Sequence, residues 1–526
     1  MSERGELKEA IMKEIAKRLL SLVIVLACFL SLCLPALADG EVQAQDEGTT
    51  QTQDETSEES TGGLLDQAAL AALKNYTYDD YLSDHADAAH PQTEISLPYD
   101  EHLEFDENLN IVENKLPYAE FTDEYFDITQ MAVISDEETL IGWRFNVEEA
   151  GLYSIKINYY NFAEYTDPET GVTYSSRSSS IAKRVYIDGE IPFYEARQFY
   201  ITRNWMDQNE IVRDSVTDND IRPFQQEMSI WQTQAVKDHM GYYSSPLQFY
   251  LSEGEHTIMF EPVRESCAIA EVIIYNEEEV LSYEELKAQY EAAGYEPVSA
   301  TDNTPIDPKA PNESNDENYI YIEAEKPSLK SSPTMYGVTD RSSPLTYPYH
   351  PSKIRLNTIG GDKWQNAGEW IEWSFTVKNA GLYRISFKSR QNLVSNSFTS
   401  RQILLDGEEI CQETNAVEFN YSSDWNLVTL GNGEEDYLFY LSEGEHTIRM
   451  VAILGEVGEI LKEAENIISE YNAIYRDILM LTGSTPDTNR DYQFEKIIPD
   501  TLENLKTQTA RLQAVSDRIK EIYGSQ

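Results

Sequence analysis

The chain of 526 residues has few basic residues, few cysteines and few histidines. Its 40 Lys and Arg stand against 93 Asp and Glu, which gives a formal net charge of −53. A polyanion of this density repels nucleic-acid phosphates, and no local basic stripe offsets the repulsion, so the sequence predicts no nucleic-acid partner. Four Cys and seven His leave little material for zinc sites or redox pairs.

The sequence also lacks the common catalytic and nucleotide-binding motifs. It contains no Gly-x-Ser-x-Gly, His-Glu-x-x-His, P-loop or dinucleotide fingerprint. Paired carboxylates abound, but among 93 acidic residues such pairs arise by chance, so they are no evidence for a glycosidase. We therefore expect a binding protein and not an enzyme.

What the chain does have is typical of a globular, β-rich protein. Apolar residues make up 41% of it, and Phe, Trp and Tyr together reach 11%, with 34 tyrosines. Aromatic residues favour strands and contact surfaces. The length predicts about two to four domains.

The N-terminus is typical of an export signal. Basic residues between positions 4 and 18 precede an apolar run from Leu19 to Ala38, which ends in Ala36-Leu37-Ala38 before Asp39. This pattern predicts a secreted or cell-surface protein. Two alternatives stay open: a retained membrane anchor, because the run is long enough to span a bilayer, and a lipoprotein signal that ends at Cys28.

An acidic tether should follow the signal. Residues 39–63 are almost all polar or acidic, so they cannot bury a core and should be disordered. Residues 64–74 have the apolar spacing of a short helix. Beyond the signal the chain keeps only Cys267 and Cys411, which are either buried thiols or one inter-domain bridge.

An internal repeat decides the predicted architecture. Three sequence blocks occur twice in the same order, and the third is identical in both copies. The pairs are Trp143–Ile155 with Trp373–Ile385, Ile187–Glu190 with Leu405–Glu408, and Phe249–Ile258 with Phe439–Ile448. The spacing between copies shrinks along the chain, so the first copy carries extra residues in its loops.

Each block has the pattern of paired strands. Apolar residues alternate around Trp143 and Trp373, which we assign to the core, and Gly-centred turns follow. Asp-Gly and Ser-Glu-Gly-Glu-His are hairpin turns, so His256 and His446 should cap or pack a turn, with catalysis the alternative. Many short strands with such turns predict two antiparallel β-sandwiches.

The end of the chain departs from this pattern. Helical spacing runs over 458–479 and again over 494–523, which predicts a helical hairpin or part of a bundle. The first copy continues after its identical block into a strand, Ala270–Tyr275, that the second copy does not have. We expect the corresponding strand of the second copy to lie beyond Gln526. The helices would then be an insertion that precedes this strand. The alternative is that the second copy closes with fewer strands.

Several segments together resemble a known family. Tyr321–Glu325, Gly368–Trp373, Ala380–Tyr383, Leu405–Gly407 and Gly444–Ile448 resemble, in this order, carbohydrate-binding modules of the galactose-binding-like β-sandwich type. With the export signal and the segment Tyr78–Asp87, the arrangement is also similar to the N-terminal half of large extracellular solute-binding proteins of carbohydrate ABC importers. The solute-binding lobes of those proteins are not in this sequence.

The resulting fold class is mainly β: two antiparallel β-sandwiches of the jelly-roll, galactose-binding-like type, followed by an α-helical hairpin. A short helix at 279–300 should close the first sandwich. The expected segments are a signal peptide at 1–38, a tether at 39–63, a short helical lead-in at 64–94, the first sandwich at 95–285, a helix end and linker at 286–317, the second sandwich at 318–455, lacking its last strand, and the hairpin at 456–526.

Sugar binding needs aromatic faces to stack on and planar polar groups for hydroxyls. Such residues gather in loop-like stretches of both copies, and the alternative for each is packing. The candidates are Tyr347, Tyr349, Trp364, Gln365, Asn366, Asn392 and Trp425 in the second copy, and Tyr160, Asn161, Tyr200, Trp205 and Trp231 in the first.

The resemblance also implies a structural calcium ion. Glu323 and Glu325 stand where the resembled modules hold one, and carboxylate oxygens suit Ca²⁺. In those modules the last strand contributes a further ligand. The alternative is an ordinary edge strand with solvated acids.

The sequence thus predicts an extracytoplasmic carbohydrate-binding protein, the N-terminal part of a solute-binding protein for sugars or oligosaccharides. Its partners would be a carbohydrate ligand and the membrane subunits of an ABC importer. Two alternatives remain: non-catalytic accessory modules of a secreted glycan-active enzyme, and a structural cell-surface adhesin or scaffold.

Overall fold

The computed structural model describes residues 73–74, 76–302, 304–307, 309–393, 395, 397–487 and 490–523. The expected signal peptide, the tether and nearly all of the short helix at 64–74 lie outside these residues. The described residues belong to one folded unit. Within them, no helix is both long and apolar enough to cross a membrane.

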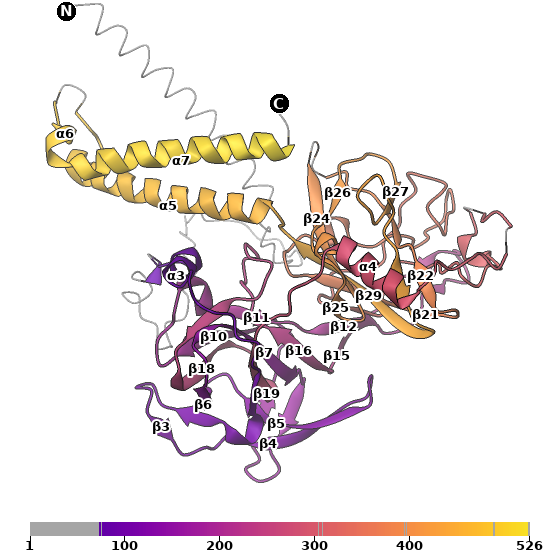
Figure 1. Cartoon of the computed structure of the whole chain (residues 1–526), viewed down its shortest axis with the longest axis horizontal. Coiled ribbons are helices and arrows are strands. Elements are labelled where there is room, and N and C mark those ends of the chain that lie inside the picture. Colours follow the sequence, from indigo (N-terminus) through magenta and orange to yellow (C-terminus); the bar gives the residue numbers. More distant parts are fainter. Residues whose placement is uncertain are drawn as a thin grey trace, which may run out of the picture. The chain divides into compact units, whose positions relative to one another are not determined.

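The first sandwich consists of two antiparallel sheets (Figure 1). One has the order β16-β7-β19-β5-β4, with β1 paired to β19 and β17 to β7; the other has the order β11-β10-β18-β6-β2-β3. The strands are β1 (Ile95–Pro98), β2 (Leu103–Phe105), β3 (Ile111–Val112), β4 (Tyr118–Asp123), β5 (Ile128–Ser135), β6 (Leu140–Val147), β7 (Gly151–Tyr160), β10 (Ile181–Ile187), β11 (Phe199–Ile201), β16 (Trp231–Ala235), β17 (Gln248–Leu251), β18 (Gly254–Arg264) and β19 (Cys267–Tyr275). The predicted last strand of the first copy is therefore present.

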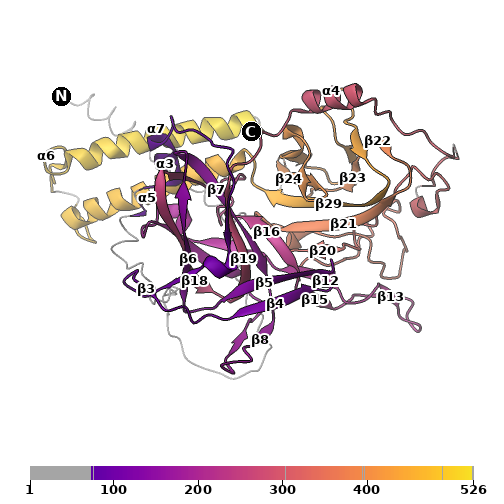
Figure 2. The same cartoon turned by 60° about the horizontal axis from the view of Figure 1, so that its bottom comes forward.

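The second sandwich repeats part of this plan (Figure 2). Its large sheet has the order β20-β21-β29-β24-β25, with β26 paired to β24, and β22-β28 and β23-β27 form two separate pairs. The strands are β20 (Leu329–Lys330), β21 (Trp370–Val377), β22 (Gly381–Tyr383), β23 (Ser386–Ser389), β24 (Phe398–Leu405), β25 (Glu408–Glu409), β26 (Val417–Asn420), β27 (Asn426–Thr429), β28 (Phe439–Leu441) and β29 (Gly444–Ile453). The predicted mainly β fold of two sandwiches is confirmed.

The core assignments also hold. Trp143 and Trp373 are both buried, and each indole Nε1 donates to a backbone carbonyl, Pro98 O at 2.8 Å and Ala324 O at 2.9 Å. Cys267 and Cys411 are buried free thiols, each within the core of its own sandwich, so they form no bridge.

The extra residues of the first copy join the two sandwiches. The long segment after β11 contains β12 (Asn204–Asp207) and β15 (Gln225–Met228), and β12 pairs with β20, so both strands extend the sheet of the second sandwich. Lys330 of β20 is fully buried at this junction, and its Nζ lies 2.6 Å from Asp207 Oδ1. The pair β13 (Val212–Arg213) with β14 (Asp220–Ile221) lies in the same segment, whereas the pair β8 (Glu164–Thr166) with β9 (Thr173–Ser175) lies earlier in the chain, between β7 and β10.

A helix opens each sandwich. In the first copy α3 (Tyr78–Asp84) has a capping box, and Tyr78 Oη accepts a hydrogen bond from Gln248 N at 2.8 Å. In the second copy α4 (Tyr283–Ala293) also has a capping box, and Tyr283 Oη accepts a hydrogen bond from Leu438 N at 2.8 Å. The expectation that this helix closes the first sandwich was therefore wrong, because its buried tyrosine packs in the core of the second.

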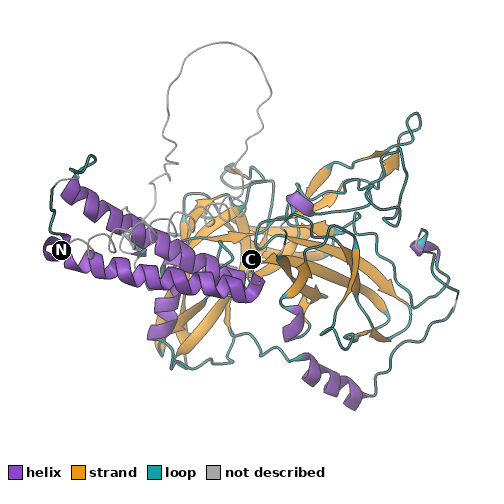
Figure 3. Ribbon diagram, turned by 90° about the horizontal axis from the view of Figure 1, so that it is seen from above, coloured by secondary structure: helices purple, strands orange, loops and turns teal. Residues whose placement is uncertain are grey.

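The helical hairpin was predicted from spacing and is present. It comprises α5 (Val457–Thr482), the short α6 (Phe494–Ile497) and α7 (Pro499–Tyr523), and Figures 1 and 3 show α5 and α7 side by side. Ile460, Ala464, Ile467 and Ile474 form the buried stripe of α5 at helical spacing.

The repeated His and Asp residues connect two turns within each sandwich. In the second copy His446 Nδ1 lies 2.7 Å from Asp406 Oδ2, and Thr447 N donates to Asp406 Oδ1 at 2.7 Å. Asp188 and His256 repeat the contact at 2.6 Å in the first copy. Both aspartates have φ near +52°, the left-handed conformation of an Asp-Gly hairpin. The two histidines therefore hold turns together, as predicted.

We expect His446→Ala to lower the free energy of unfolding by about 2 kcal/mol, because the Asp406 carboxylate loses its buried partner. Thermal melting of the purified chain measures the effect. Glu443→Ala, an exposed change in the same turn, is the control and should melt like the wild type. Equal melting of His446→Ala and Glu443→Ala would show that the contact contributes nothing.

Candidate functional site

Three polar and aromatic side chains meet at one end of the second sandwich. Ser389 of β23 pairs with Asn426 of β27, so the next cross-strand neighbours along the ladder are Arg390 and Trp425. The Arg390 guanidinium carbon lies 4.9 Å from the centroid of the Trp425 ring. Arg390 Nη2 also lies 2.6 Å from Asp340 Oδ2. We call Asp340, Arg390 and Trp425 the loop trio.

The carboxylate of the trio is held in place from several sides. The backbone N of Asp340 donates to Asn357 Oδ1 at 2.8 Å, and Ser342 N donates to Asp340 Oδ1 at 2.7 Å. Arg390 Nη1 donates to Ser342 Oγ at 2.7 Å. Burial opposes ionisation of Asp340, but the Ser342 hydrogen bonds, the Arg390 charge and Trp425 outweigh it and hold the pKa of that carboxyl below its usual range.

The first sandwich has a different trio in the same place. Tyr160 and Trp231 are cross-strand partners there, and Trp231 N donates to Asp123 Oδ2 at 3.1 Å. Their rings lie 5.2 Å apart, and Phe121 stacks on Tyr160 at 5.0 Å. Tyr160 and Trp231 are both buried, so this end of the first sandwich is closed by packed aromatic rings.

The structure gathers part of the predicted binding residues of the second copy around the trio. Trp425 belongs to it, and Asn392 lies exposed two residues beyond Arg390. Tyr347 and Tyr349 are on the loop that also carries Asp340. Tyr349 is exposed, whereas Tyr347 is half-buried with its ring 6.2 Å from that of Tyr321.

The other predicted residues of the second copy lie on a separate turn ahead of β21. Trp364 Nε1 donates to Glu369 O at 3.0 Å, and its ring lies 4.4 Å from the Arg401 guanidinium. Asn366 hydrogen-bonds to the Glu369 carboxylate at 3.0 Å, and Gln365 is exposed beside it. None of the described contacts joins these residues to the trio. The contacts of Trp364 and Asn366 stabilise the turn itself.

The predicted residues of the first copy have structural roles. Tyr160 and Trp231 are packed as described above, which argues against ligand binding by either. Trp205 is on β12, opposite Lys330 of β20, at the junction of the sandwiches. Asn161 is fully buried and donates to Glu227 Oε1 at 3.1 Å, and Tyr200 accepts a hydrogen bond from Gln198 at 3.0 Å.

The sequence analysis missed Arg390, Asp340 and Tyr421. Tyr421 is exposed, and its backbone pairs with Gln391 next to Arg390. Alignment of the two copies would have indicated Arg390, since it takes the position of Tyr160 at the end of the same strand. The charged Arg390 in place of the buried aromatic Tyr160 is the sequence signal that this end of the second sandwich differs from that of the first.

The predicted calcium ligands only partly fit such an ion. Glu325 is buried and its Oε1 has no hydrogen-bond partner, but Glu323 forms an ion pair with Lys326. The described residues contain no cluster of three or more His, Cys, Asp or Glu side chains that could hold a metal. Ca²⁺ takes six to eight oxygen ligands, so these two carboxylates alone do not complete a site.

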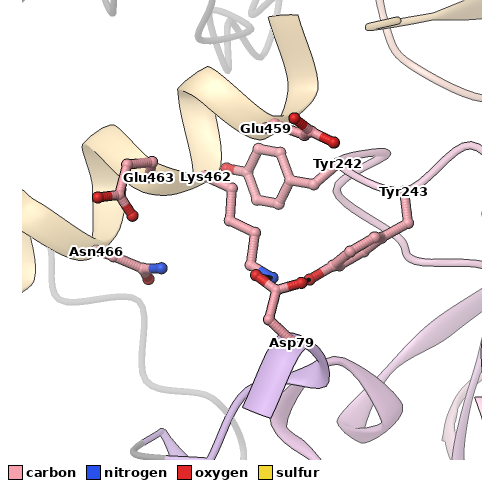
Figure 4. A pocket seen from close by; sticks show the side chains of 7 residues that line it. All are labelled: Asp79, Tyr242, Tyr243, Glu459, Lys462, Glu463 and Asn466. Carbon is pink, nitrogen blue, oxygen red and sulfur yellow. Dashed lines mark hydrogen bonds and ion pairs between the residues drawn. The ribbon is translucent and has the colours of Figure 1, made fainter. Parts of the chain in front are cut away.

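A second polar site lies where the helical hairpin meets the first sandwich (Figure 4). A cavity of about 230 Å³ is lined by residues of α3, the loop before β17 and α5. Lys462 of α5 is buried there, with its Nζ 2.7 Å from Asp79 Oδ2, 3.8 Å from Glu195 Oε1 and 4.2 Å from the Tyr243 ring centroid. Burial raises the pKa of Glu195, although Lys462 opposes the shift.

The end of the chain is similar to a known family of protein domains. Residues 459–526, which comprise almost all of the hairpin, match the model of the bacterial solute-binding protein 4-helix bundle domain. A search of the curated proteins gives no match. The C-terminal segment is thus similar to a helical domain of bacterial solute-binding proteins.

Solved structures similar to the chain include carbohydrate-binding modules. A family 35 carbohydrate-binding module from Clostridium thermocellum aligns at 8% identity and TM-score 0.18, over 35% of this chain and 99% of that one. The CBM35 from Cellvibrio japonicus Abf62 aligns at 9% identity and TM-score 0.18, over 35% and 95%. The GH26-CBM35 β-(1,4)-mannanase of Podospora anserina aligns at 7% identity and TM-score 0.20, over 36% of this chain and 29% of the enzyme chain.

Glu325 should make stability depend on pH. Burial and the nearby Glu323 charge raise its pKa to about 8 in the folded chain, while the unfolded value stays near 4.5. The folded state then binds the proton that the unfolded state releases, so stability falls by a few kcal/mol as pH rises from about 5 to about 8 and levels off above.

We expect Glu325→Gln to remove this loss, so that the variant melts above the wild type at pH 8 and close to it at pH 5. Melting curves across this range test the expectation, with the exposed change Glu443→Gln as control. A loss of stability between pH 5 and pH 8 that is as large in Glu325→Gln as in the wild type would contradict it.

Proposed function

We propose that this chain is an extracytoplasmic carbohydrate-binding protein, the N-terminal part of a solute-binding protein for sugars or oligosaccharides. The observation that carries the proposal is the combination of the solute-binding-protein helical segment at 459–526 with a β-sandwich that carries a half-buried polar and aromatic trio. The similar modules from Clostridium thermocellum and Cellvibrio japonicus are carbohydrate-binding modules of family 35.

The loop trio has the chemistry that sugar hydroxyls need. A guanidinium presents several N–H donors in one plane, and a carboxylate accepts from hydroxyl groups, so Arg390 and Asp340 together can bind two neighbouring hydroxyls. The exposed ring of Tyr421 and the edge of Trp425 offer apolar surface for the C–H face of a pyranose.

Charge favours a neutral ligand. The Arg390 and Asp340 charges cancel within the trio, and the chain as a whole carries a net charge of −53. An acidic sugar would be repelled at long range and would find no unpaired cation in the trio. We therefore propose neutral sugars as the ligand class, bound without catalysis.

The remaining parts of the proposal concern location and partners. The basic and apolar N-terminal pattern supports export to the secreted or cell-surface compartment. In a solute-binding protein the bound sugar passes to the membrane subunits of an ABC importer, which are the protein partners we propose.

Arg390→Tyr tests the site with a change that the chain itself already tolerates, because Tyr160 stands at this position in the first sandwich. We expect the variant to fold and to lose at least about tenfold in sugar affinity, since the guanidinium N–H donors to the sugar hydroxyls are gone. A glycan array identifies the ligand, and calorimetric titration with the best neutral oligosaccharide measures Kd.

The matched control is Arg384→Tyr, which makes the same change at an exposed position six residues earlier in the chain. It should bind like the wild type. An array without any hit, or an unchanged Kd in Arg390→Tyr, would count against the trio as the site.

We also propose that Glu325 and Glu323 form part of a structural calcium site, with Lys326 displaced from Glu323 when the ion binds. Calcium chloride at about 1 mM should then raise the melting temperature of the chain. This concentration is chosen because extracellular modules bind Ca²⁺ with dissociation constants of about 0.1 to 1 mM. Glu325→Gln should remove the increase, and magnesium at the same concentration should not reproduce it. No calcium-dependent change in the wild type would refute the site.

A further inference from the structure

The first sandwich is completed by a strand that has no counterpart among the described residues of the second. In the first, β19 pairs with β7 on one side over most of its length and with β1 on the other side over Glu271–Ile274. In the second, β23 corresponds to the C-terminal half of β7, and among the described residues its strand partner is β27, on the other side. The edge of β23 that faces the position of β19 is unpaired.

The segment on the far side of this position is also unpaired. Trp143 Nε1 donates to the last residue of β1, Pro98, and Trp373 donates in the same way to Ala324. The residues just before Ala324 thus take the place of β1. Residues 320–324 form no strand, although Tyr-Ile-Tyr-Ile is a strong strand sequence.

The missing neighbour leaves apolar side chains partly uncovered. Ile155 and Ile157 of β7 are each 1% exposed beneath β19. The corresponding residues, Ile385 and Phe387, are only half-buried. The second copy of this strand is interrupted at Arg384 and Ile385, between β22 and β23, whereas β7 runs unbroken over ten residues.

The backbone groups at the free edge of β23 are oriented to form hydrogen bonds with an added strand. Leu430 N donates to Ile385 O, so the backbone groups of Ile385 point to the β27 side. Because these groups alternate in an antiparallel ladder, those of Ser386 and Lys388 point to the free edge.

Charge at the edge matches what β19 brings in the first copy. Glu271 of β19 stands opposite Asn158 of β7, whose counterpart in the second sandwich is Lys388. Lys388 Nζ contacts the backbone carbonyl of Leu345 and is exposed, and the described residues give it no carboxylate partner. An acidic residue at the Glu271 position of an added strand would pair with it.

We propose that the gap between residues 320–324 and β23 is a strand-binding slot. Its occupant is an extended peptide segment of the β19 type, with β-branched apolar residues facing the core and an acidic residue facing Lys388. Binding adds backbone hydrogen bonds to Ser386 and Lys388 and covers Ile385 and Phe387, which is β-strand addition. This proposal is independent of sugar binding.

A peptide with the sequence of residues 266–276, with Cys267→Ser and lysines added at both ends for solubility, is the probe. Added to the full chain, it should raise the melting temperature and slow amide exchange of Ser386 and Lys388 at least about tenfold. A peptide with the same residues in scrambled order should do neither. Amides of β7, which already has β19 beside it, should not change.

Ser386→Pro is the variant that isolates the slot. Proline is tolerated where the N–H faces an unpaired edge, so the chain should fold, keep its melting temperature and lose peptide binding, while Ser386→Thr should keep binding. The peptide with Glu271→Lys should bind about tenfold more weakly because it repels Lys388. Slow exchange of Ser386 and Lys388 without peptide, or no binding by the wild type, would overturn the proposal.

Discussion

The antiparallel ladder between β21 and β29 is the interaction on which the second sandwich depends. Its register runs from Trp370 opposite Val451 to Val377 opposite Gly444. That register places Trp373 in the core and brings His446 to the turn where it meets Asp406. The ladder β6–β18 does the same for the first sandwich. A one-residue slip would turn every core side chain of the strand to solvent, so the register is strongly specified.

Much of this could be predicted because repetition and alternation are local signals. The identical block Phe249–Ile258 and Phe439–Ile448 implied one structure twice, and the spacing in 458–479 predicted α5. Two features could not be predicted in this way. The role of α4 depends on which core its Tyr283 enters, and the joining of β12 to β20 depends on a pairing between distant loops. Neither leaves a periodic pattern in the sequence.

The candidate site was harder to predict for a related reason. Aromatic residues on loops have the same sequence signature whether they pack or bind, and Tyr160 and Trp231 proved to be packed. What distinguishes the second copy is one substitution within a conserved geometry, Arg390 where the first has Tyr160. A buried aromatic pair closes a surface, whereas a guanidinium over an indole keeps donors at it. Duplication thus yielded one end that is closed by packed aromatic rings and one where a guanidinium, a carboxylate and an indole meet.

The helical hairpin follows the second sandwich in the chain but makes its buried ion pair with the first. Lys462 is buried, and transferring a charge from water costs several kcal/mol unless partners are fixed in place. Asp79 and Glu195 are fixed, since α3 is held by its capping box and Glu195 Oε2 accepts from Tyr78 N at 2.8 Å. At the root of α5, Gly458 packs so closely on Tyr242 that a Cβ would lie 2.7 Å from its carbonyl oxygen. Together with the β12–β20 pairing, these contacts connect the hairpin and both sandwiches to one another, so the second sandwich is not an independent module on a free linker.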